Sequence, residues 1–211
     1  MGTVSRTPSW TTYRESIGDR SGLFRALRDA WSPTKALYLG SYLDLSPSTA
    51  LPSVTYVDTD RRAARFFADD ALVAAELRGR TAPDAGAEVA FLHADYTEPL
   101  PVAPAGFDLL ISLYTGPVWD HCQRYLAPRG WFLANTSHGD ACLAALDPSL
   151  QLVAAVHERD GAYHLDTQSL DSYLVPKRAA AANADAIRRL GRGIAYTRSA
   201  FAYVFQAVER R

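Results

Sequence analysis

The sequence predicts an α/β fold, a doubly wound and mostly parallel sheet whose final strand runs antiparallel. The first observation is a series of four short apolar segments, at 36–42, 54–60, 89–96 and 107–116, each ending where polar residues begin. Such runs are typical of strands that are buried on both faces of a parallel sheet. The second observation is that helical patterns alternate with these segments, and the third is a long aromatic strand at 201–208. Strand–helix alternation that ends in a long strand favours this Rossmann-like architecture.

The first elements follow the order that this fold requires. Residues 22–31 place apolar side chains three and four apart, which predicts a helix packed on the sheet, and the first strand follows at 36–40. Ser46 and Pro47 form a helix-start pair, but Pro52 comes five residues after Pro47. The crossover helix therefore has room for only about one turn.

The later elements are placed by turn and capping signals. A helix is expected to begin near Asp60 as its N-cap, and a second to run from Gly116-Pro117 to near Leu126. A short helix closed by Asp147 follows the loop TSHGDA. The remaining strands are expected at 54–58, 88–93, 107–113, 130–135, 150–158 and 201–208.

The length predicts a single domain with two additions. A chain of 211 residues fits one domain, here with an N-terminal helical extension (1–34) and an insertion between the last two strands (161–200). The insertion is rich in Tyr and Arg. It fits either a lid or anion-accepting wall over a ligand, or a solvated helix with charges three and four residues apart.

Charge, apolar runs and cysteines indicate which partners and which cellular compartment to expect. The 22 basic and 23 acidic residues nearly cancel, so no field steers the chain to nucleic acid or to a membrane surface. No apolar run reaches signal-peptide or membrane-spanning length. Cys122 and Cys142 fit neither a CxxC motif nor a disulfide framework and indicate reduced thiols of a cytoplasmic protein. The aromatic last strand allows a homodimer edge and equally a covered strand.

Polar residues at the strand ends predict a nucleotide-type site. In parallel sheets, ligands bind beyond the carboxyl ends of the strands. The residues at those ends are Gly40, Ser41, Tyr42, Asp58, Asp95, Tyr96 and Tyr114.

Several of these segments resemble the class I S-adenosylmethionine-dependent methyltransferases, over roughly 36–158 and 199–208. The best local match is YLAPRGWFLA, where a helix ends in Leu and is followed by Pro, a basic residue, Gly and an apolar strand. Asp58 lies eighteen positions after Gly40, near the ~20 expected for an acidic residue that holds ribose hydroxyls. The resemblance implies this fold, S-adenosylmethionine as cofactor and a small-molecule methyl acceptor.

The resemblance also implies roles for single residues. Asp58 would hold the ribose, and Asp95, with Tyr96 beside it, would receive the adenine amino group. The turn Gly40–Tyr42 would face the methionyl end of the cofactor, and Tyr114 would stack on adenine or on the substrate. The alternatives from the residues alone remain open. They are a tight turn at Gly40–Ser41 with Tyr42 packed over the sheet edge, Asp58 satisfied by loop amides, Asp95 forming an Asx-turn, and Tyr114 packed in the core.

The glycine loop departs from the family pattern, which is an acidic residue, any residue and then G-x-G-x-G. Tyr38 stands at the acidic position, and Tyr42 and Asp44 stand at the second and third glycines. Those glycines let the backbone approach the ligand, and Tyr42 would fill that space. The second hypothesis is therefore a methyltransferase-fold protein that binds another nucleotide-like ligand or a protein partner.

The densest polar cluster of the chain is the segment 135–140, which reads NTSHGD. His138 suits a general base because an unperturbed imidazole has a pKa of ~6.5, and Asp140 or Asp95 is placed to orient it. The alternative is that Ser137 or Asp140 caps a helix that starts at Gly139, with His138 in solvent. A different reaction at His138 and Asp140 is a third hypothesis.

Other site classes lack their signatures. There is no G-x-S-x-G elbow for a hydrolase, and Ser137, His138 and Asp140 are too close in one loop to converge as a triad. No G-x-G-x-x-G follows the first strand, which disfavours NAD or FAD. No HExxH motif or paired Cys indicates a metal.

Overall fold

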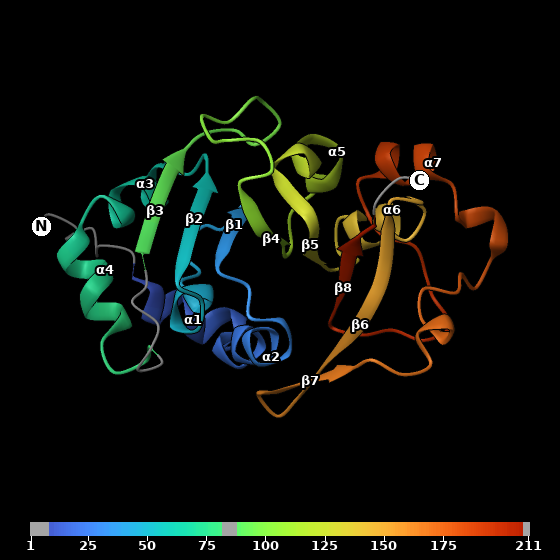
Figure 1. The fold of residues 1–211 in the computed structure, drawn as a ribbon, viewed down its shortest axis with the longest axis horizontal. Coiled ribbons are helices and arrows are strands. Elements are labelled where there is room, and N and C mark those ends of the chain that lie inside the picture. Colours follow the sequence, from blue (N-terminus) through green and yellow to red (C-terminus); the bar gives the residue numbers. More distant parts are fainter. Residues whose placement is uncertain (1–8, 82–87, 209–211) are drawn as a thin grey trace, which may run out of the picture.

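The computed structural model describes residues 9–81 and 88–208. In these ranges the strands form one sheet in the order β3-β2-β1-β4-β5-β8-β6-β7 (Figure 1). The strands are β1 (Lys35–Leu39), β2 (Ser53–Asp58), β3 (Glu88–His93), β4 (Phe107–Ser112), β5 (Leu126–Ala134), β6 (Leu150–Arg159), β7 (Ala162–Asp166) and β8 (Ala202–Ala207).

The pairing confirms the predicted fold class. β1 pairs in parallel with β2 and β4, β2 with β3, and β4 with β5. The last strand, β8, is antiparallel to both of its neighbours, β5 and β6. The chain thus forms a mostly parallel, doubly wound sheet with an antiparallel closing strand.

The two faces of the sheet bury different side chains of the same strand. In β1, Ala36 and Tyr38 belong to one core and Leu37 and Leu39 to the other, the period of two expected for a strand buried on both faces. The first face is covered by α1 (Trp10–Ile17), α2 (Ser21–Trp31), α3 (Arg61–Phe67) and α4 (Asp70–Leu77). The second is covered by α5 (Val118–Cys122) and α6 (Asp140–Ala144).

Two local predictions are confirmed. The crossover after β1 is one 3₁₀ turn, η1 (Ser46–Thr49), as the prolines require. Asp60 is the N-cap of α3, and its Oδ1 accepts the Arg62 amide at 2.7 Å. The hydrogen bonds from Arg62 lower the pKa of Asp60 to about 2.

Two local predictions need correction. The helix expected from Asp60 onward is broken at Ala68, because Asp69 caps a new helix, α4, by accepting the Leu72 amide. The segment predicted as a fully buried third strand is the edge strand β3, and none of its residues is fully buried. An apolar run alone does not separate an edge strand from a central one.

The insertion 161–200 begins with a strand that the sequence did not predict. β7 pairs with β6 as a hairpin, and its tip packs against the start of α2, where Tyr163 lies against Gly22 (Figure 1). The rest of the insertion contains the helix α7 (Ala184–Leu190) and short 3₁₀ turns. β8 lies between β5 and β6, so the aromatic last strand is a covered strand and offers no dimer edge. A homodimer stays a prediction.

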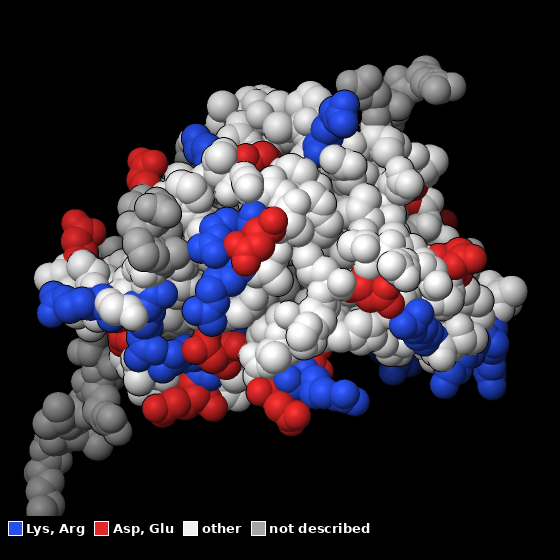
Figure 2. Space-filling model, turned by 60° about the horizontal axis from the view of Figure 1, so that its bottom comes forward, with Lys and Arg blue, Asp and Glu red and all other residues white. Residues whose placement is uncertain are grey.

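Surface charge, helix character and the placement of metal-binding residue types give three further findings. On the face shown in Figure 2, basic and acidic side chains are interspersed. Among the helices of residues 9–81 and 88–208, none combines the length and the apolar character that crossing a membrane requires. Within the same ranges, no three His, Cys, Asp or Glu side chains gather where they could hold a metal ion.

Candidate functional site

The candidate site lies at the carboxyl ends of β1 and β4. We call this place the switch point because the chain leaves β1 toward β2 on one side and returns to β4 on the other. Gly40 directly follows β1 with φ +65°, and a Cβ added to it would lie 2.5 Å from Thr115 Oγ1. Only glycine fits this approach, which brings the loops after β1 and β4 into contact.

The loop after β1 is a tight turn. The Asp44 amide donates to the Ser41 carbonyl at 3.0 Å, and Tyr42 inside the turn has φ 45°. The Tyr42 ring contacts Tyr13 of α1 edge-on at 4.8 Å, and the Arg62 guanidinium lies 5.2 Å from its centroid. Tyr42 thus packs between α1 and the start of α3.

Asp58 ties this turn to the end of β2. Its Oδ2 accepts the Tyr42 amide at 2.7 Å and its Oδ1 accepts the Asp60 amide at 2.8 Å. The carboxylate is partly exposed. A carboxylate has about four acceptor positions, so Asp58 keeps capacity for further donors.

A buried ion pair holds Asp44, which stands at the position of the third glycine in the family pattern. Asp44 Oδ2 accepts from Arg20 Nη1 and from the Tyr38 hydroxyl, both at 3.1 Å, and its Oδ1 accepts the Ser46 amide at 3.0 Å. Asp44 is fully buried and the Arg20 side chain is 6% exposed. Burial opposes the charge of Arg20, but Tyr38 and Asp44 hold its pKa above the usual value. Burial, with Asp44 beside it, raises the pKa of Tyr38 well above its usual value.

Three buried polar atoms of this network and of the adjoining turn have no hydrogen-bond partner among the described residues. They are Arg20 Nε, Ser41 Oγ and Ser46 Oγ. A buried donor without a partner costs on the order of 1–3 kcal/mol.

Of the two candidate residues after β3, Asp95 faces solvent and Tyr96 points toward the switch point. Asp95 is exposed, and its Oδ1 accepts the Thr97 amide at 2.9 Å and the Thr97 hydroxyl at 2.7 Å, an Asx-turn. These hydrogen bonds lower the pKa of Asp95. The Tyr96 hydroxyl lies 3.0 Å from Thr115 Oγ1 and donates to the Gly116 carbonyl at 3.2 Å. Tyr96 therefore supports the loop after β4.

Tyr114 presents an exposed ring beside the switch point. Its side chain is 48% exposed, its φ is 60°, and its amide donates to Asn135 Oδ1 at 3.3 Å. The Arg20 guanidinium lies 4.8 Å from the ring centroid, and Phe201 meets the ring edge-on at 6.4 Å. An exposed aromatic ring that is held from behind suits stacking on a planar ligand.

Asp140 lies in the interior, where its carboxylate accepts hydrogen bonds from the first amides of α5. Its Oδ2 accepts from Ser112 Oγ at 2.5 Å and from the Val118 amide at 2.9 Å, and its Oδ1 accepts the Trp119 amide at 3.2 Å. Burial raises the pKa of Asp140 to about 6, against the effect of these hydrogen bonds. A Cβ added to Gly116 would lie 3.3 Å from His138 Cβ and 3.6 Å from Asp140 Cβ, so the two residues are near each other. Among the described residues, however, the Asp140 carboxylate bonds Ser112 and the α5 amides and not His138, so it caps α5 in place of the expected orienting contact.

His138 is exposed at the side of the loop after β4. A Cβ added to Gly116 would lie 3.3 Å from His138 Cβ, so the two loops adjoin. The insertion packs on the same segment from the other side. A Cβ on Gly139 would lie 2.7 Å from Ile187 of α7, and one on Gly193 would meet the Thr136 carbonyl.

The structure gathers most of the residues that the sequence predicted. Loops of neighbouring strands bring Gly40, Ser41, Tyr42, Asp58, Tyr96 and Tyr114 to one edge of the sheet, with His138 adjoining, whereas Asp140 is buried and Asp95 faces solvent. Arg20 and Thr115 were not predicted. Arg20 precedes Tyr38 by 18 residues and lies in the N-terminal extension, so no local pattern marks it.

Comparison with solved structures identifies the fold. The 16S rRNA methylase RmtB superposes with a TM-score of 0.50 at 13% identity, over 93% of this chain and 65% of that one. TrmN from Thermus thermophilus gives a TM-score of 0.50 at 16% identity, over 89% of this chain and 48% of that one. The N-methyltransferase NodS from Bradyrhizobium japonicum WM9, in complex with S-adenosyl-L-homocysteine, gives 0.48 at 11% identity, over 97% and 90%.

No protein-family model and no curated protein sequence matches the chain. Identities this low bear on the fold alone. The sheet order, the antiparallel β8 and the superpositions on RmtB and TrmN agree, and the chain has the fold of the class I S-adenosylmethionine-dependent methyltransferases.

Proposed function

We propose that the protein is an S-adenosylmethionine-dependent methyltransferase that acts on a small molecule. The observation that carries the proposal is the position of Asp58, whose partly exposed carboxylate ends β2 and holds the turn after β1 through the Tyr42 amide at 2.7 Å. Its remaining acceptor positions suit the two hydroxyls of a ribose.

Two exposed residues in the loops after β3 and β4 would supply the other contacts that a nucleoside needs. Tyr114 offers a fixed, exposed ring for stacking, and the exposed Asp95 carboxylate offers an acceptor for an adenine amino group. The turn Gly40–Tyr42, with the buried Ser41 hydroxyl, would face the methionyl end. The unpartnered Ser41 Oγ supports this because it is a polar atom without a partner among the described residues.

Methyl transfer needs mainly in-line positioning and exclusion of water. An acceptor oxygen or nitrogen would bond to the methyl carbon as the carbon–sulfur bond breaks, with its electrons kept by sulfur. The acceptor proton would pass to the exposed imidazole of His138, which adjoins the loop after β4 at Gly116.

Calorimetric titration with S-adenosylhomocysteine tests the role of Asp58. We expect micromolar binding to the wild type and a loss of at least about tenfold in Asp58→Ala, because the ribose hydroxyls lose a charged acceptor. Asp69→Ala is the matched control, since Asp69 caps α4 away from the switch point, and it should bind as the wild type does. No heat and no thermal shift at millimolar ligand in the wild type would contradict the proposal.

A second function is favoured by the packing at Gly40. The Thr115 side chain lies against this glycine, where a Cβ would approach its Oγ1 to 2.5 Å, and Asp44 stands buried where the family pattern has glycine. Both observations leave less room for a methionyl group than for a nucleoside. The protein would then bind another nucleotide-like ligand in the same fold.

The two functions differ in how much the methionyl group contributes to affinity. We expect S-adenosylhomocysteine to bind at least about tenfold more tightly than 5′-methylthioadenosine if the methionyl carboxylate and amine find partners. Equal affinities of the two ligands for the wild type would favour the nucleoside-binding function. Calorimetry under one buffer condition measures both.

A further inference from the structure

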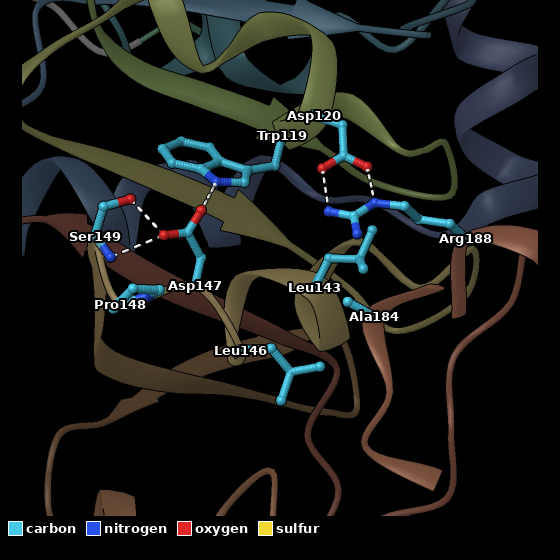
Figure 3. A pocket seen from close by; sticks show the side chains of 9 residues that line it. All are labelled: Trp119, Asp120, Leu143, Leu146, Asp147, Pro148, Ser149, Ala184 and Arg188. Atoms are coloured by element: carbon cyan, nitrogen blue, oxygen red, sulfur yellow. Dashed lines mark hydrogen bonds and ion pairs between the residues drawn. The ribbon is translucent and has the colours of Figure 1, made fainter. Parts of the chain in front are cut away.

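A second cavity lies on the flank of the molecule, between α5, α6 and α7. Its volume is about 580 Å³, within the range of about 300–1,000 Å³ that small-molecule sites occupy. It is lined by Trp119, Asp120, Leu143, Leu146, Asp147, Pro148, Ser149, Ala184 and Arg188 (Figure 3). None of the residues assigned above to the cofactor or to proton transfer lines it.

The floor of this flank cavity is apolar and anchored. Trp119 and Leu143 are buried, at 5% and 4% exposure, whereas Leu146 is 42% exposed. The Trp119 indole Nε1 donates to Asp147 Oδ2 at 2.7 Å, and Asp147 Oδ1 accepts from the amide and the hydroxyl of Ser149. The hydrogen bond to Asp147 therefore fixes the indole and pairs its N–H group. The cavity beside it has room for the ring of a ligand.

The charged groups of the flank cavity favour a cation. The Arg188 guanidinium donates to both oxygens of Asp120, at 2.6 and 2.8 Å, and lies 3.6 Å from Asp185. Asp185 lies outside the cavity, and the lining itself holds two carboxylates, Asp120 and Asp147, against the one guanidinium of Arg188. Figure 3 shows Asp147 below the Trp119 indole and Asp120 paired with Arg188 to its right. A ligand anion would meet carboxylate oxygens on both sides, whereas a ligand cation would meet acceptors and an indole ring, the best partner for a cation among the aromatic side chains.

We propose that the flank cavity is a binding site for a small organic amine with an aromatic or aliphatic body. The body would pack on Trp119, Leu143 and Leu146, and the ammonium group would lie near the Asp120 carboxylate. This site does not depend on S-adenosylmethionine binding at the switch point.

The test compares three ligands of nearly the same shape at pH 7, by calorimetry and ligand-observed NMR. 2-Phenylethylamine is the cationic probe, 2-phenylethanol the neutral one and 3-phenylpropionate the anionic one. We expect the amine to bind with a Kd on the order of 1 mM, the alcohol about tenfold more weakly, and the carboxylate not at all. Equal affinity of the alcohol, tighter binding of the carboxylate, or no binding of the amine up to about 10 mM would overturn the proposal.

Matched variants test whether the amine binds in the flank cavity. Leu146→Lys puts a protein cation at the mouth and should weaken the amine by at least about tenfold. Leu190→Lys makes the same change at a 56% exposed leucine of α7 that does not line the cavity, and it should leave the affinity unchanged. Asp120→Asn should weaken the amine and leave the alcohol unchanged. Unchanged amine affinity in Leu146→Lys would reject this location.

Discussion

Asp44→Ala is expected to lower the free energy of unfolding by about 3–5 kcal/mol, because removing one partner of a buried ion pair leaves the other charge uncompensated. Arg20, 6% exposed in its side chain, would lose the carboxylate at 3.1 Å. The Tyr38 hydroxyl and the Ser46 amide would lose their acceptor in the same change. Urea unfolding at pH 7 measures the loss.

Two further variants test whether the loss of stability in Asp44→Ala comes from the buried charge that remains on Arg20. The exposed pair Arg28–Asp29 has an equally direct contact at 2.7 Å with side chains 34% and 65% exposed. Asp29→Ala should therefore cost at most about 1 kcal/mol. The double variant Arg20→Met, Asp44→Leu removes both charges and should be more stable than Asp44→Ala alone. A loss below about 1 kcal/mol in Asp44→Ala would show that water reaches the pair.

This ion pair stabilises the turn after β1, where Tyr42 and Asp44 stand at positions that are glycines in the family pattern. Arg20 and Tyr38 both donate to the Asp44 carboxylate, so the turn is held from inside by charge and hydrogen bonds. The turn itself still needs Gly40, where φ is positive and Thr115 leaves no room for a Cβ. The backbone at the switch point is thus fixed before any ligand binds, which favours preorganised binding.

The sequence predicts the sheet well because each central strand carries its own signal. Strands buried on both faces are short apolar runs, and the prolines around η1 mark the one-turn crossover without reference to the rest of the fold. β7 escapes prediction because AYHLD is a half-exposed edge strand of a hairpin, and such a strand needs few apolar residues.

The sequence predicts where the site lies on the sheet, but only some of the hydrogen bonds and ion pairs within it. Asp58 can be placed because a strand end fixes its location along the chain. Asp140 caps the start of α5, and its partner Val118 lies 22 residues earlier in the chain. The segment 135–140 carries no information about where α5 begins in space, so this role could not be predicted from the segment. The same holds for Arg20 and Asp44, which are 24 residues apart.

The stability of the wild type relative to Asp140→Asn is expected to fall as the pH rises from about 4 to about 6. Burial raises the pKa of Asp140 to about 6 in the folded protein, from 3.8 without burial. Between these values the unfolded chain has released the proton and the folded chain still holds it, so a rise in pH favours unfolding. A shift of about two pKa units corresponds to roughly 3 kcal/mol, fully present below pH 4 and lost by pH 6.

Urea unfolding of both proteins at pH 4, 5, 6 and 7 measures this difference. Asparagine keeps one oxygen acceptor for Ser112 or the α5 amides but does not titrate, and other carboxylates cancel in the comparison. Asp60→Asn is the control, because hydrogen bonds from Arg62 lower the pKa of Asp60 to about 2. Its effect changes below pH 4, so its difference from the wild type should stay nearly flat at these four pH values. A difference between wild type and Asp140→Asn that stays flat from pH 4 to pH 6 would mean that Asp140 ionises as it does in water. The start of α5, and with it the loop that carries Tyr114 and Thr115, would then be open to solvent.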